Sequence, residues 1–345
     1  MKLQTPSGYT PTLVPDMMEQ AIAFLKKDFQ EIFAQSLNLR RVTAPLFVLS
    51  GTGINDDLNG TERAVSFPIQ DMNQTRAEVV HSLAKWKRMK LAAYQMPPGY
   101  GLYTDMNAIR ADEELDNLHS LYVDQWDWEK TIRSEDRTLD FLFAAVETIY
   151  ASVRQVEKDV YTHYPHIKPI LPERITFLHS EDMLREMPEL SPLERETQMA
   201  MKYGAIFVAG IGGRLADGNK HDGRAPDYDD WSTESKPGYH GLNGDIILWN
   251  PVLERAFEIS SMGIRVDKTA LIRQLEMEQC SQRKELLFHQ ALLNDEIPLS
   301  IGGGIGQSRL CMYFLRCAHI GEVQVSLWPP EMITQAAAAG IVLRS

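Results

Sequence analysis

Apolar residues recur at helical spacing in two long segments of the chain. The first segment begins at Asp16, a residue type that can cap a helix, and ends near Asn38. Its apolar face consists of Met18, Ile22, Leu25, Phe29, Ile32 and Phe33. The apolar face of the second segment consists of Leu139, Leu142, Val146, Ile149, Val153, Val156 and Val160. Since residues three and four positions apart share one side of a helix, these patterns predict two amphipathic helices, the second of them a scaffold element.

Polar and apolar residues instead alternate in two segments that lie between these helices. Residues 103–110 and 121–128 each alternate in the manner of a strand, and the acidic stretch 111–116 separates them. This pattern predicts an antiparallel pair joined by a long loop. Because side chains point to opposite faces of a strand in turn, the second segment has one polar and one aromatic face. The polar face carries Gln125, Asp127 and Glu129, and the aromatic face carries Trp126 and Trp128. A polar face on a sheet whose other side is buried favours a pocket.

Shorter apolar runs predict further strands, and no linker interrupts the alternation of strands and helices. These runs cover residues 39–43, 78–82, 175–178, 205–208, 246–249 and 258–265. Residues 16–335 are therefore expected to form a single domain. Residues 1–15 contain Pro6, Gly8, Pro11 and Pro15, which predict a loose N-terminal arm, and residues 336–345 are expected to be a C-terminal tail.

The composition excludes several classes of protein. Of the 345 residues, 44% are hydrophobic and 24% charged, which is typical of a globular protein with a large core. A formal net charge of −12 gives no general footprint for nucleic acid, so no nucleic-acid partner is expected. No apolar run has the length of a membrane helix and the first residues do not form a signal peptide, so we expect a cytoplasmic protein with no membrane partner. The three cysteines have no disulfide or zinc spacing.

A glycine-rich stretch near the end of the chain is the first candidate for binding chemistry. Residues 302–310 read Gly-Gly-Gly-Ile-Gly-Gln-Ser-Arg-Leu, and apolar residues at helical spacing follow them. The pattern predicts a glycine loop that enters a helix with Arg309 in its first turn. Such a loop and helix start can hold a phosphate, and an arginine there adds a planar cation. The same pattern also occurs in plain turns, and it is neither a P-loop nor a Rossmann fingerprint in its usual place.

Three other stretches also combine polar chemistry with unusual local composition. Residues 83–88 are basic in an acidic chain, which favours either an anion site or a solvated helix face. Residues 51–60 are polar and glycine-rich, so their carboxylates face water or a ligand. Residues 217–245 read as a long loop with aromatic and acidic side chains. A loop of this length in a compact domain favours function.

Four of these strings together resemble one family, the ammonia-dependent asparagine synthetases, or aspartate–ammonia ligases. The strings are residues 79–88, 122–129, 224–233 and 302–310, and the resemblance extends over residues 18–330. This family shares the catalytic fold of the class II aminoacyl-tRNA synthetases. The resemblance therefore implies an α+β fold with a mostly antiparallel sheet flanked by helices.

The three sequence motifs of the class II fold can be assigned by this resemblance. The helix and strand that end at Pro45 resemble motif one, residues 110–129 resemble motif two, and the glycine stretch with Arg309 resembles motif three. Motif-one elements in this fold usually form a two-fold interface, so the resemblance also implies a homodimer.

The resemblance implies a two-step reaction with ATP and Mg²⁺. The side-chain carboxylate of aspartate attacks the α-phosphorus of ATP, which gives β-aspartyl adenylate and pyrophosphate, and ammonia then displaces AMP to form asparagine. Two anions must meet in the first step, so cations are needed. By similarity, Arg110 is assigned to the α-phosphate and reacting carboxylate, Arg309 to the adenine face and phosphates, and Lys87 is a third candidate cation. Asp245 and Glu258 are the implied Mg²⁺ ligands, or else plain hydrogen-bond acceptors.

Most of the remaining site residues are also assigned by resemblance. Asp56, Ser82 and Gln125, together with Lys87, match the pocket that holds the aspartate substrate. Attack by nitrogen needs neutral ammonia, so a carboxylate is wanted that holds ammonium and takes its proton. We assign this role to Asp229, with Asp127 as its partner, not by resemblance but because Asp229 is a carboxylate in the long aromatic loop. The positions that line the nucleotide are Ser120, Ser261 and Arg265.

Three alternatives to this reading are less consistent with the sequence. An aspartyl- or asparaginyl-tRNA synthetase would need a surface for tRNA, which the acidic composition does not provide. A glutamine-dependent asparagine synthetase resembles an N-terminal cysteine hydrolase, whereas here no cysteine precedes Cys280. A catalytically idle amino-acid sensor would lose the phosphate cations, whereas Arg110 and Arg309 are both present.

Overall fold

A computed structural model describes residues 3–55 and 62–344 of the chain. The helices are α1 (Pro15–Leu37), α2 (Ala84–Ala93), α3 (Leu139–His163), α4 (Ser180–Glu186), α5 (Pro192–Tyr203), α6 (Lys268–Met277), α7 (Leu287–Leu293), α8 (Gln307–Phe314) and α9 (Pro330–Ala338). The strands are β1 (Leu39–Arg41), β2 (Phe47–Leu49), β3 (Ser66–Ile69), β4 (Thr75–Val79), β5 (Gly101–Ile109), β6 (Tyr122–Thr131), β7 (Thr176–His179), β8 (Ala205–Ala209), β9 (Glu234–Lys236), β10 (Tyr239–His240), β11 (Asn243–Asn250), β12 (Arg255–Ile264) and β13 (Ser300–Gly306).

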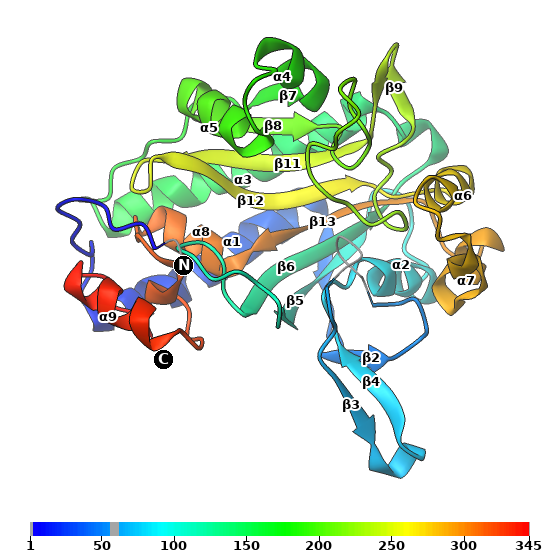
Figure 1. The fold of residues 1–345 in the computed structure, drawn as a ribbon, viewed down its shortest axis with the longest axis horizontal. Coiled ribbons are helices and arrows are strands. Elements are labelled where there is room, and N and C mark those ends of the chain that lie inside the picture. Colours follow the sequence, from blue (N-terminus) through cyan, green and yellow to red (C-terminus); the bar gives the residue numbers. More distant parts are fainter. Residues whose placement is uncertain (1–2, 56–61, 345) are drawn as a thin grey trace.

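The centre of the molecule is a large mixed sheet (Figure 1). Within the described residues it has eight strands in the order β1-β5-β6-β13-β12-β11-β8-β7. Only the outer pairs β1–β5 and β7–β8 are parallel, and each inner pair is antiparallel. The predicted α+β fold with a mostly antiparallel sheet is confirmed, including the predicted pairing of β5 with β6.

The two predicted amphipathic helices cover the aromatic face of this sheet. Helix α1 lies against α3, and its apolar side meets the tryptophans of β6. The ring centroid of Phe29 is 4.7 Å from that of Trp126, and Phe33 meets Trp128 edge-on at 6.2 Å. Asp16 lies in the first turn of α1, whose N-cap is Val14, because Pro15 occupies the first helical position.

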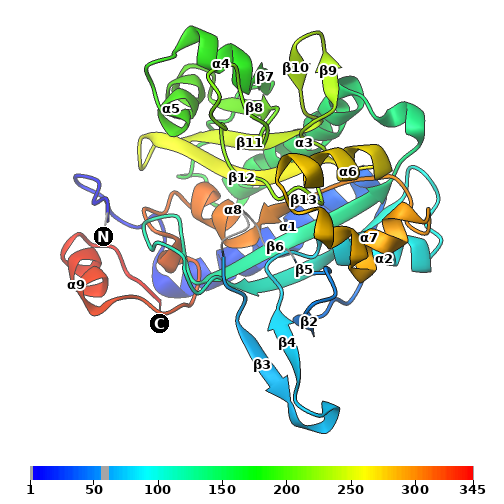
Figure 2. The same cartoon turned by 45° about the vertical axis from the view of Figure 1, so that its right-hand side comes forward.

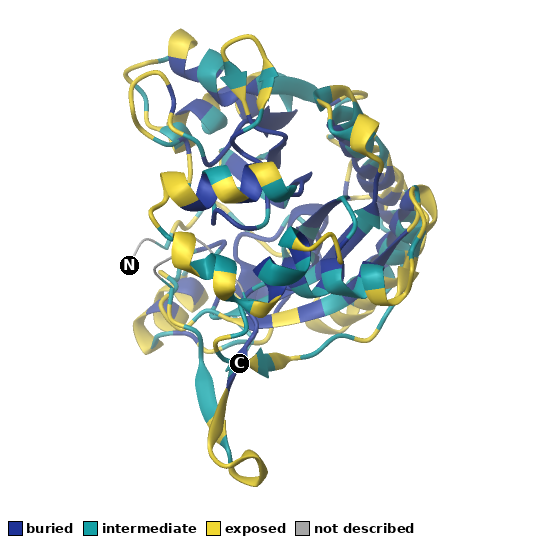
Figure 3. Cartoon of the chain, turned by 90° about the vertical axis from the view of Figure 1, so that its right-hand side faces the viewer, coloured by how far each residue is buried: buried dark blue, intermediate teal, exposed yellow. Residues whose placement is uncertain are grey.

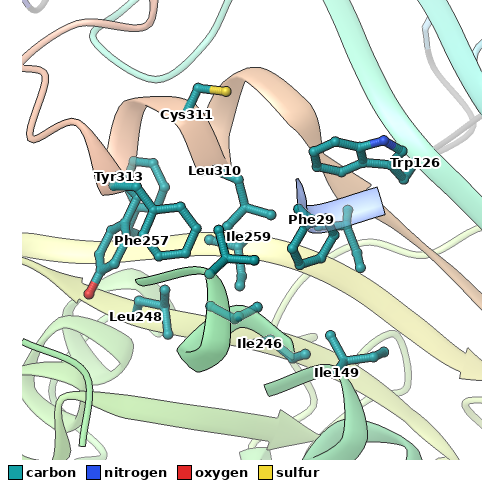
Figure 4. Packing of buried hydrophobic residues seen from close by; sticks show 14 of the residues in the cluster. Phe29, Trp126, Ile149, Ile246, Leu248, Phe257, Ile259, Leu310, Cys311 and Tyr313 are labelled. Atoms are coloured by element: carbon teal, nitrogen blue, oxygen red, sulfur yellow. The ribbon is translucent and has the colours of Figure 1, made fainter. Parts of the chain in front are cut away.

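Helix α8 packs on the same side of the sheet. Figure 4 shows Leu310 and Tyr313 of α8 beside Ile259 and Phe257 of β12. The rings of Tyr313 and Phe257 are 5.7 Å apart, and all four side chains are buried. In Figure 3 the central strands are accordingly mostly dark blue, and exposed residues lie mainly on the outer faces of the helices, in loops and on short strands such as β2 and β4. One face of the sheet is thus fully used by the core, which leaves the other face for polar groups.

The glycine-rich stretch is a strand in the middle of the sheet, so the prediction of a glycine loop is wrong. Strand β13 pairs with β6 on one side and with β12 on the other, and α8 begins directly after it. A Cβ atom on Gly302 would lie 2.6 Å from the carbonyl oxygen of Trp128 and would collide with the carboxylate of Glu129. A Cβ atom on Gly304 would meet the side-chain amide of Gln125. The glycines therefore make room for polar side chains of β6 that cross the neighbouring strand.

A side chain at Gly302 is expected to destabilise the protein. Gly302→Ala should lower the free energy of unfolding by about 1–3 kcal/mol, because the backbone of β6 cannot move away from the new methyl group. The control is Gly213→Ala, whose Cβ would be 3.4 Å from its nearest neighbour, an ordinary contact. The control should change stability by less than about 0.5 kcal/mol. Urea unfolding followed by circular dichroism measures both, and equal losses would contradict the steric explanation.

Both ends of the chain are held against the body of the protein. Residues 3–14 form no helix or strand, but Thr12 Oγ1 donates a hydrogen bond to the carbonyl oxygen of Leu315 at 2.6 Å. Near the other end, Ile341 is buried, and α9 runs across the predicted boundary at residue 335. The arm and tail are thus less loose than we predicted, because they find partners far away in the sequence. The division into arm, domain and tail stays a prediction.

A small three-stranded sheet, β2-β4-β3, projects from the body (Figures 1 and 2). Our sequence analysis predicted only a short strand near β4. Helices α6 and α7 pack together beside α2, and Met89 of α2 lies against them. None of the helices in the described part of the chain is long and apolar enough to cross a membrane.

Candidate active site

The floor of the candidate site is the polar face of β6 together with the glycines of β13. The register places Gly304 between Asp127 of β6 and Ser261 of β12. Since directly opposed residues share a face, the side chains of Asp127 and Ser261 flank the space at Gly304, which the side-chain amide of Gln125 enters. Gln125 lies two residues before Asp127 and therefore on the same face. The prediction of one polar face and one aromatic face on this strand is confirmed.

A β-bulge brings a second acidic residue into this site. Glu258 and Ser261 are three residues apart, so a regular strand would direct them to opposite faces. The pairing of β11 with β12 shifts register between Ile246 and Ile247, which face Ser260 and Glu258 respectively. Such a shift turns the strand locally and re-aims a side chain. Both Glu258 and Ser261 consequently line the same cavity.

Two adjoining cavities open above this floor. The first has a volume of about 270 Å³, and the second of about 100 Å³. The predicted site residues that line the first cavity are Ser82, Arg110, Gln125, Asp127, Asp229, Glu258, Ser261 and Arg265. Those that line the second cavity are Arg110, Ser120, Gln125, Glu258 and Arg309. Sequence reasoning therefore named most of the polar wall of the first cavity and about half of the polar wall of the second.

Arg110 stands where the two cavities meet. It lines both of them, as do Gln125 and Glu258. Its side chain is 28% exposed, its nearest acidic partner is Glu113 at 3.5 Å, and its Nε atom has no hydrogen-bond partner among the described residues. A guanidinium with unused donors at this junction can bind an anion that reaches across from either cavity.

Arg309 borders the second cavity and is held in place by β12. Its Nη1 atom donates a hydrogen bond of 2.8 Å to the carbonyl oxygen of Glu258 and lies 3.5 Å from the Glu258 carboxylate. Ser120 lies across the cavity, where its hydroxyl donates to Ser326 at 2.9 Å. The second cavity thus has two planar cations, Arg110 and Arg309, a hydroxyl from Ser120, and an apolar wall from Leu118, Ile259 and Ile320.

Lys87 lines neither cavity as described, which corrects the expectation that it contacts a substrate anion. Its side chain is 0% exposed, and its ammonium pairs with Asp127 and donates a 2.8 Å hydrogen bond to the carbonyl oxygen of Trp128. Burial lowers the pKa of Lys87, although Asp127 and Glu129 act in the opposite direction. Lys87 therefore holds the carboxylate of Asp127 in place and does not reach the described cavities.

Arg265 joins two buried carboxylates at the back of the first cavity. Its Nε and Nη2 atoms contact Glu129 at 3.1 and 3.0 Å, and its Nη1 atom pairs with Asp229. Burial raises the pKa of Asp229, against the attraction of Arg265 and Arg224. The Oδ2 atom of Asp229 is buried and has no hydrogen-bond partner among the described residues. This oxygen is available to accept a hydrogen bond from a ligand.

The two predicted magnesium ligands differ in how well they fit a metal ion. Glu258 lines both cavities, and its carboxylate is 44% exposed. Asp245 lines neither cavity as described, because both of its oxygens accept from Nη2 of Arg224 at 2.6 Å. Burial and the nearby Glu258 raise the pKa of Asp245, although Arg224 opposes them. Among the described residues no three His, Cys, Asp or Glu side chains form a metal-binding group. Glu258 fits Mg²⁺ shared with phosphates, whereas Asp245 as arranged does not.

Some predictions fall outside these cavities, and some wall residues were not predicted. Asp56 lies outside the described residues. The basic start of α2 is neither a solvated face nor a site wall, because Lys85 pairs with Asp227 at 2.8 Å and is buried like Lys87. Arg224 lines the first cavity and was missed as a site residue. The signal that could have found it is its place as the one basic residue in the acidic, aromatic stretch 224–231.

The fold is that of the catalytic domains of class II aminoacyl-tRNA synthetases. The structure resembles asparaginyl-tRNA synthetase from Pyrococcus horikoshii complexed with asparaginyl-adenylate, with a TM-score of 0.67 at 13% sequence identity, over 91% of this chain and 70% of that one. It also resembles aspartyl-tRNA synthetase from Entamoeba histolytica, with a TM-score of 0.62 at 12% identity, over 91% of this chain and 59% of that one. At such identities the similarity concerns the fold alone.

The sequence comparisons are more specific. Residues 16–340 match the model of the family described as aspartate-ammonia ligase. The chain is 58% identical over 338 residues to an aspartate–ammonia ligase of Parabacteroides distasonis, covering 98% of both chains. It is 53% identical over 332 residues to an aspartate–ammonia ligase of Clostridium perfringens, covering 96% of both. The chain belongs to the aspartate–ammonia ligase family, as the four sequence strings indicated, and is an enzyme of the ligase class.

Proposed function

We propose that this protein makes L-asparagine from L-aspartate, ammonia and ATP through a β-aspartyl-adenylate intermediate, with release of AMP and pyrophosphate. Family membership supports the overall reaction. The observation that supports an adenylate intermediate is that two cavities meet at Arg110. A reaction that joins a carboxylate to an α-phosphate needs two neighbouring sites with a shared cation between them.

Aspartate occupies the first cavity in this proposal. The buried carboxylate of Asp127 suits its ammonium group, and Ser82 and Gln125 supply neutral hydrogen bonds. Lys87 is reassigned from a substrate contact to a positioning residue, because its ammonium pairs with the carboxylate of Asp127. Asp56, from the predicted substrate pocket, stays a prediction. The β-carboxylate of aspartate then points toward Arg110.

ATP occupies the second cavity, with its α-phosphate at the junction. Arg309 binds the adenine face and phosphates, Ser120 lies against the nucleotide, and Ser261 and Arg265 border the phosphates from the first cavity. An oxygen of the β-carboxylate attacks the α-phosphorus, and the bond to the β-phosphate oxygen breaks, so that pyrophosphate leaves. Arg110 is bound to both reacting groups and stabilises the negative charge on the phosphorus oxygens during the transfer.

Mg²⁺ is proposed to bind at Glu258 together with phosphate oxygens, and would neutralise the polyphosphate when bound. Asp245 acts through Arg224 in this scheme, since its carboxylate holds that guanidinium at the cavity wall. An arginine so placed can border the leaving pyrophosphate. The role of Asp245 as a metal ligand would require Arg224 to move first.

Ammonia enters as ammonium and is bound at Asp229, with Asp127 nearby. Burial raises the pKa of Asp229, which makes this carboxylate a better proton acceptor than an exposed aspartate. After the proton moves to Asp229, the nitrogen lone pair attacks the carbonyl carbon of the adenylate. The bond between that carbon and the phosphate oxygen breaks, AMP leaves, and the nitrogen loses a second proton to solvent as asparagine forms.

Three further expectations belong to the proposal. A homodimer formed through α1 and β1, the elements that resemble motif one, follows from the fold class. A cytoplasmic location without nucleic-acid partners is in keeping with the net charge of −12, which favours small-molecule chemistry.

A product assay tests the proposed function. Purified protein with aspartate, ATP, Mg²⁺ and ammonium should form asparagine and AMP in equal amounts, and omission of ammonium should abolish asparagine. Formation of ADP would mean acyl-phosphate chemistry and would overturn the adenylate. Aspartate binding without turnover would favour an amino-acid sensor, and transfer of an aminoacyl group to tRNA would favour a synthetase.

A further inference from the structure

We propose that the N-terminal arm positions one wall of the ATP cavity through Asn117, and that the main chain of Gln4 thereby sets the affinity for ATP. The inference rests on the proposed placement of ATP in the second cavity. Part of the wall of that cavity comes from two segments, residues 118–120 and residues 320–324. These segments are about two hundred residues apart in sequence, and Asn117 connects them.

The hydrogen bonds of Asn117 make this connection in both directions. The Nδ2 atom donates to the carbonyl oxygen of Ala318 at 2.7 Å, and the carbonyl oxygen of Asn117 accepts from the backbone N–H of Ile320 at 2.8 Å. Asn117 is 2% exposed, so solvent cannot replace these bonds. Leu118 and Ile320, which both line the cavity, are thereby held at a fixed separation.

The N-terminal arm binds the same amide group. The backbone N–H of Gln4 donates to Oδ1 of Asn117 at 2.7 Å, and Nδ2 of Asn117 donates to the carbonyl oxygen of Gln4 at 2.8 Å. The arm therefore completes the hydrogen bonding of a buried amide that has no other partner for its Oδ1 atom among the described residues. Three of the four hydrogen bonds that an asparagine amide can make are used here.

A second contact of the arm reaches the same region. The hydroxyl group of Tyr9 donates to Oε2 of Glu322 at 2.8 Å, and Oε1 of Glu322 accepts from the backbone N–H groups of Ala318 and His319 at 2.8 and 3.0 Å. Both arm contacts thus converge on residues 318–322, which include the cavity residue Ile320. Leu118 and Ile320, the residues that these contacts hold, line the ATP cavity and do not line the aspartate cavity as described. The effect of the arm is therefore directed at one substrate.

Two substitutions at one position test this inference. Gln4→Pro removes the backbone N–H that binds Asn117, whereas Gln4→Ala keeps it and removes only the side-chain bond to the carbonyl oxygen of Leu253. Gln4→Pro should raise the KM for ATP about 5- to 10-fold, the factor expected from a lost buried hydrogen bond, and leave the KM for aspartate within about twofold. Gln4→Ala should leave both constants within about twofold of the unchanged protein.

Asn117→Ala supplies a second, stronger variant. It removes the three side-chain bonds at once, so its KM for ATP should exceed that of Gln4→Pro. Calorimetric titration with ATP alone, without aspartate or ammonium, should give the same order of dissociation constants. Circular dichroism checks folding. If Asn117→Ala does not fold, the comparison of Gln4→Pro with Gln4→Ala tests the inference by itself.

The outcomes separate this inference from the proposed function. If the unchanged protein forms no asparagine, the proposed function fails, and the calorimetric order still tests the arm. If it forms asparagine but Gln4→Pro binds ATP as Gln4→Ala does, the inference is overturned and the function stands. Equal increases in the KM values for ATP and aspartate would also overturn it, because they would indicate a general loss of structure.

Discussion

Arg110→Lys is expected to lower the rate of adenylate formation by about 10²- to 10³-fold. Lysine keeps the positive charge but loses the planar pair of donors with which a guanidinium can bind carboxylate and phosphate oxygens together. Arg110 lines both cavities, so it is the side chain placed to make both contacts. The loss should appear in kcat more than in either KM, because the two anions come closest in the transition state.

Aspartate-dependent exchange of pyrophosphate into ATP measures this step without ammonium. The control is Arg133→Lys, since Arg133 is an exposed arginine whose side chain is 64% accessible and which lines neither cavity as described. The control should exchange at the rate of the unchanged protein. Unchanged exchange by Arg110→Lys would remove Arg110 from the chemistry, and a selective rise in the KM for ATP alone would make it a nucleotide contact only.

The elements that sequence predicted well are those whose pattern is local. Strands β5 and β6 alternate with a period of two, and the split between Gln125 and Trp126 follows from that period alone. Helices α1 and α3 carry long apolar stripes that match the spacing of a helix. For the same reason the polar floor of the site could be identified before its neighbours in space were known.

The glycine stretch was wrongly predicted to be a loop because the need for glycine at these positions comes from side chains of another strand. Glycine is a poor strand former by itself, so local propensity indicates a loop. In the structure Gly302 and Gly304 face Glu129 and Gln125, whose side chains occupy the space that a Cβ atom would need. The sequence shows that these positions carry no side chain, but it does not show that Glu129 and Gln125 occupy the space.

Charge pairing was equally hard to predict. Lys87 and Asp245 have the residue types of a phosphate contact and a metal ligand, but each is buried and paired, with Asp127 and Arg224 respectively. Which charges become partners depends on segments far apart in the sequence. The type of a residue therefore predicted its chemistry. Only the fold shows whether the residue lines a cavity or is buried in an ion pair.

These buried pairs have a common consequence for the site. Lys87, Asp127, Glu129, Arg265 and Asp229 form one connected set of charges behind the first cavity. Burying such charges is costly, and a pair of well-packed apolar residues would often be as stable. The set holds the carboxylates of Asp127 and Asp229 in fixed positions before substrate binds. Fixed charges of this kind need no reorganisation during the reaction, which is how preorganised sites gain rate.

Asp229→Asn is expected to separate the two chemical steps. It should leave aspartate-dependent pyrophosphate exchange within about threefold of normal, yet slow asparagine formation by about 10²- to 10⁴-fold, the usual contribution of a general base. Asparagine keeps the shape and can still accept from Arg265, whereas alanine would leave Arg265 without this partner. The amide cannot take a proton from ammonium. The loss of asparagine formation in Asp229→Asn should become smaller as the pH rises, because more neutral ammonia is then present in solution.

Single-turnover assays that start from preformed adenylate follow the second step by itself, and pyrophosphate exchange follows the first. Asp217→Asn is the matched control, since Asp217 is an exposed aspartate of the same long loop, bonds to Asn219, and lines neither cavity as described. It should keep both rates. Equal loss of both steps in Asp229→Asn would mean that Asp229 binds aspartate and does not serve ammonia. Loss of the second step with no recovery at higher pH would mean that Asp229 positions the nucleophile without accepting its proton.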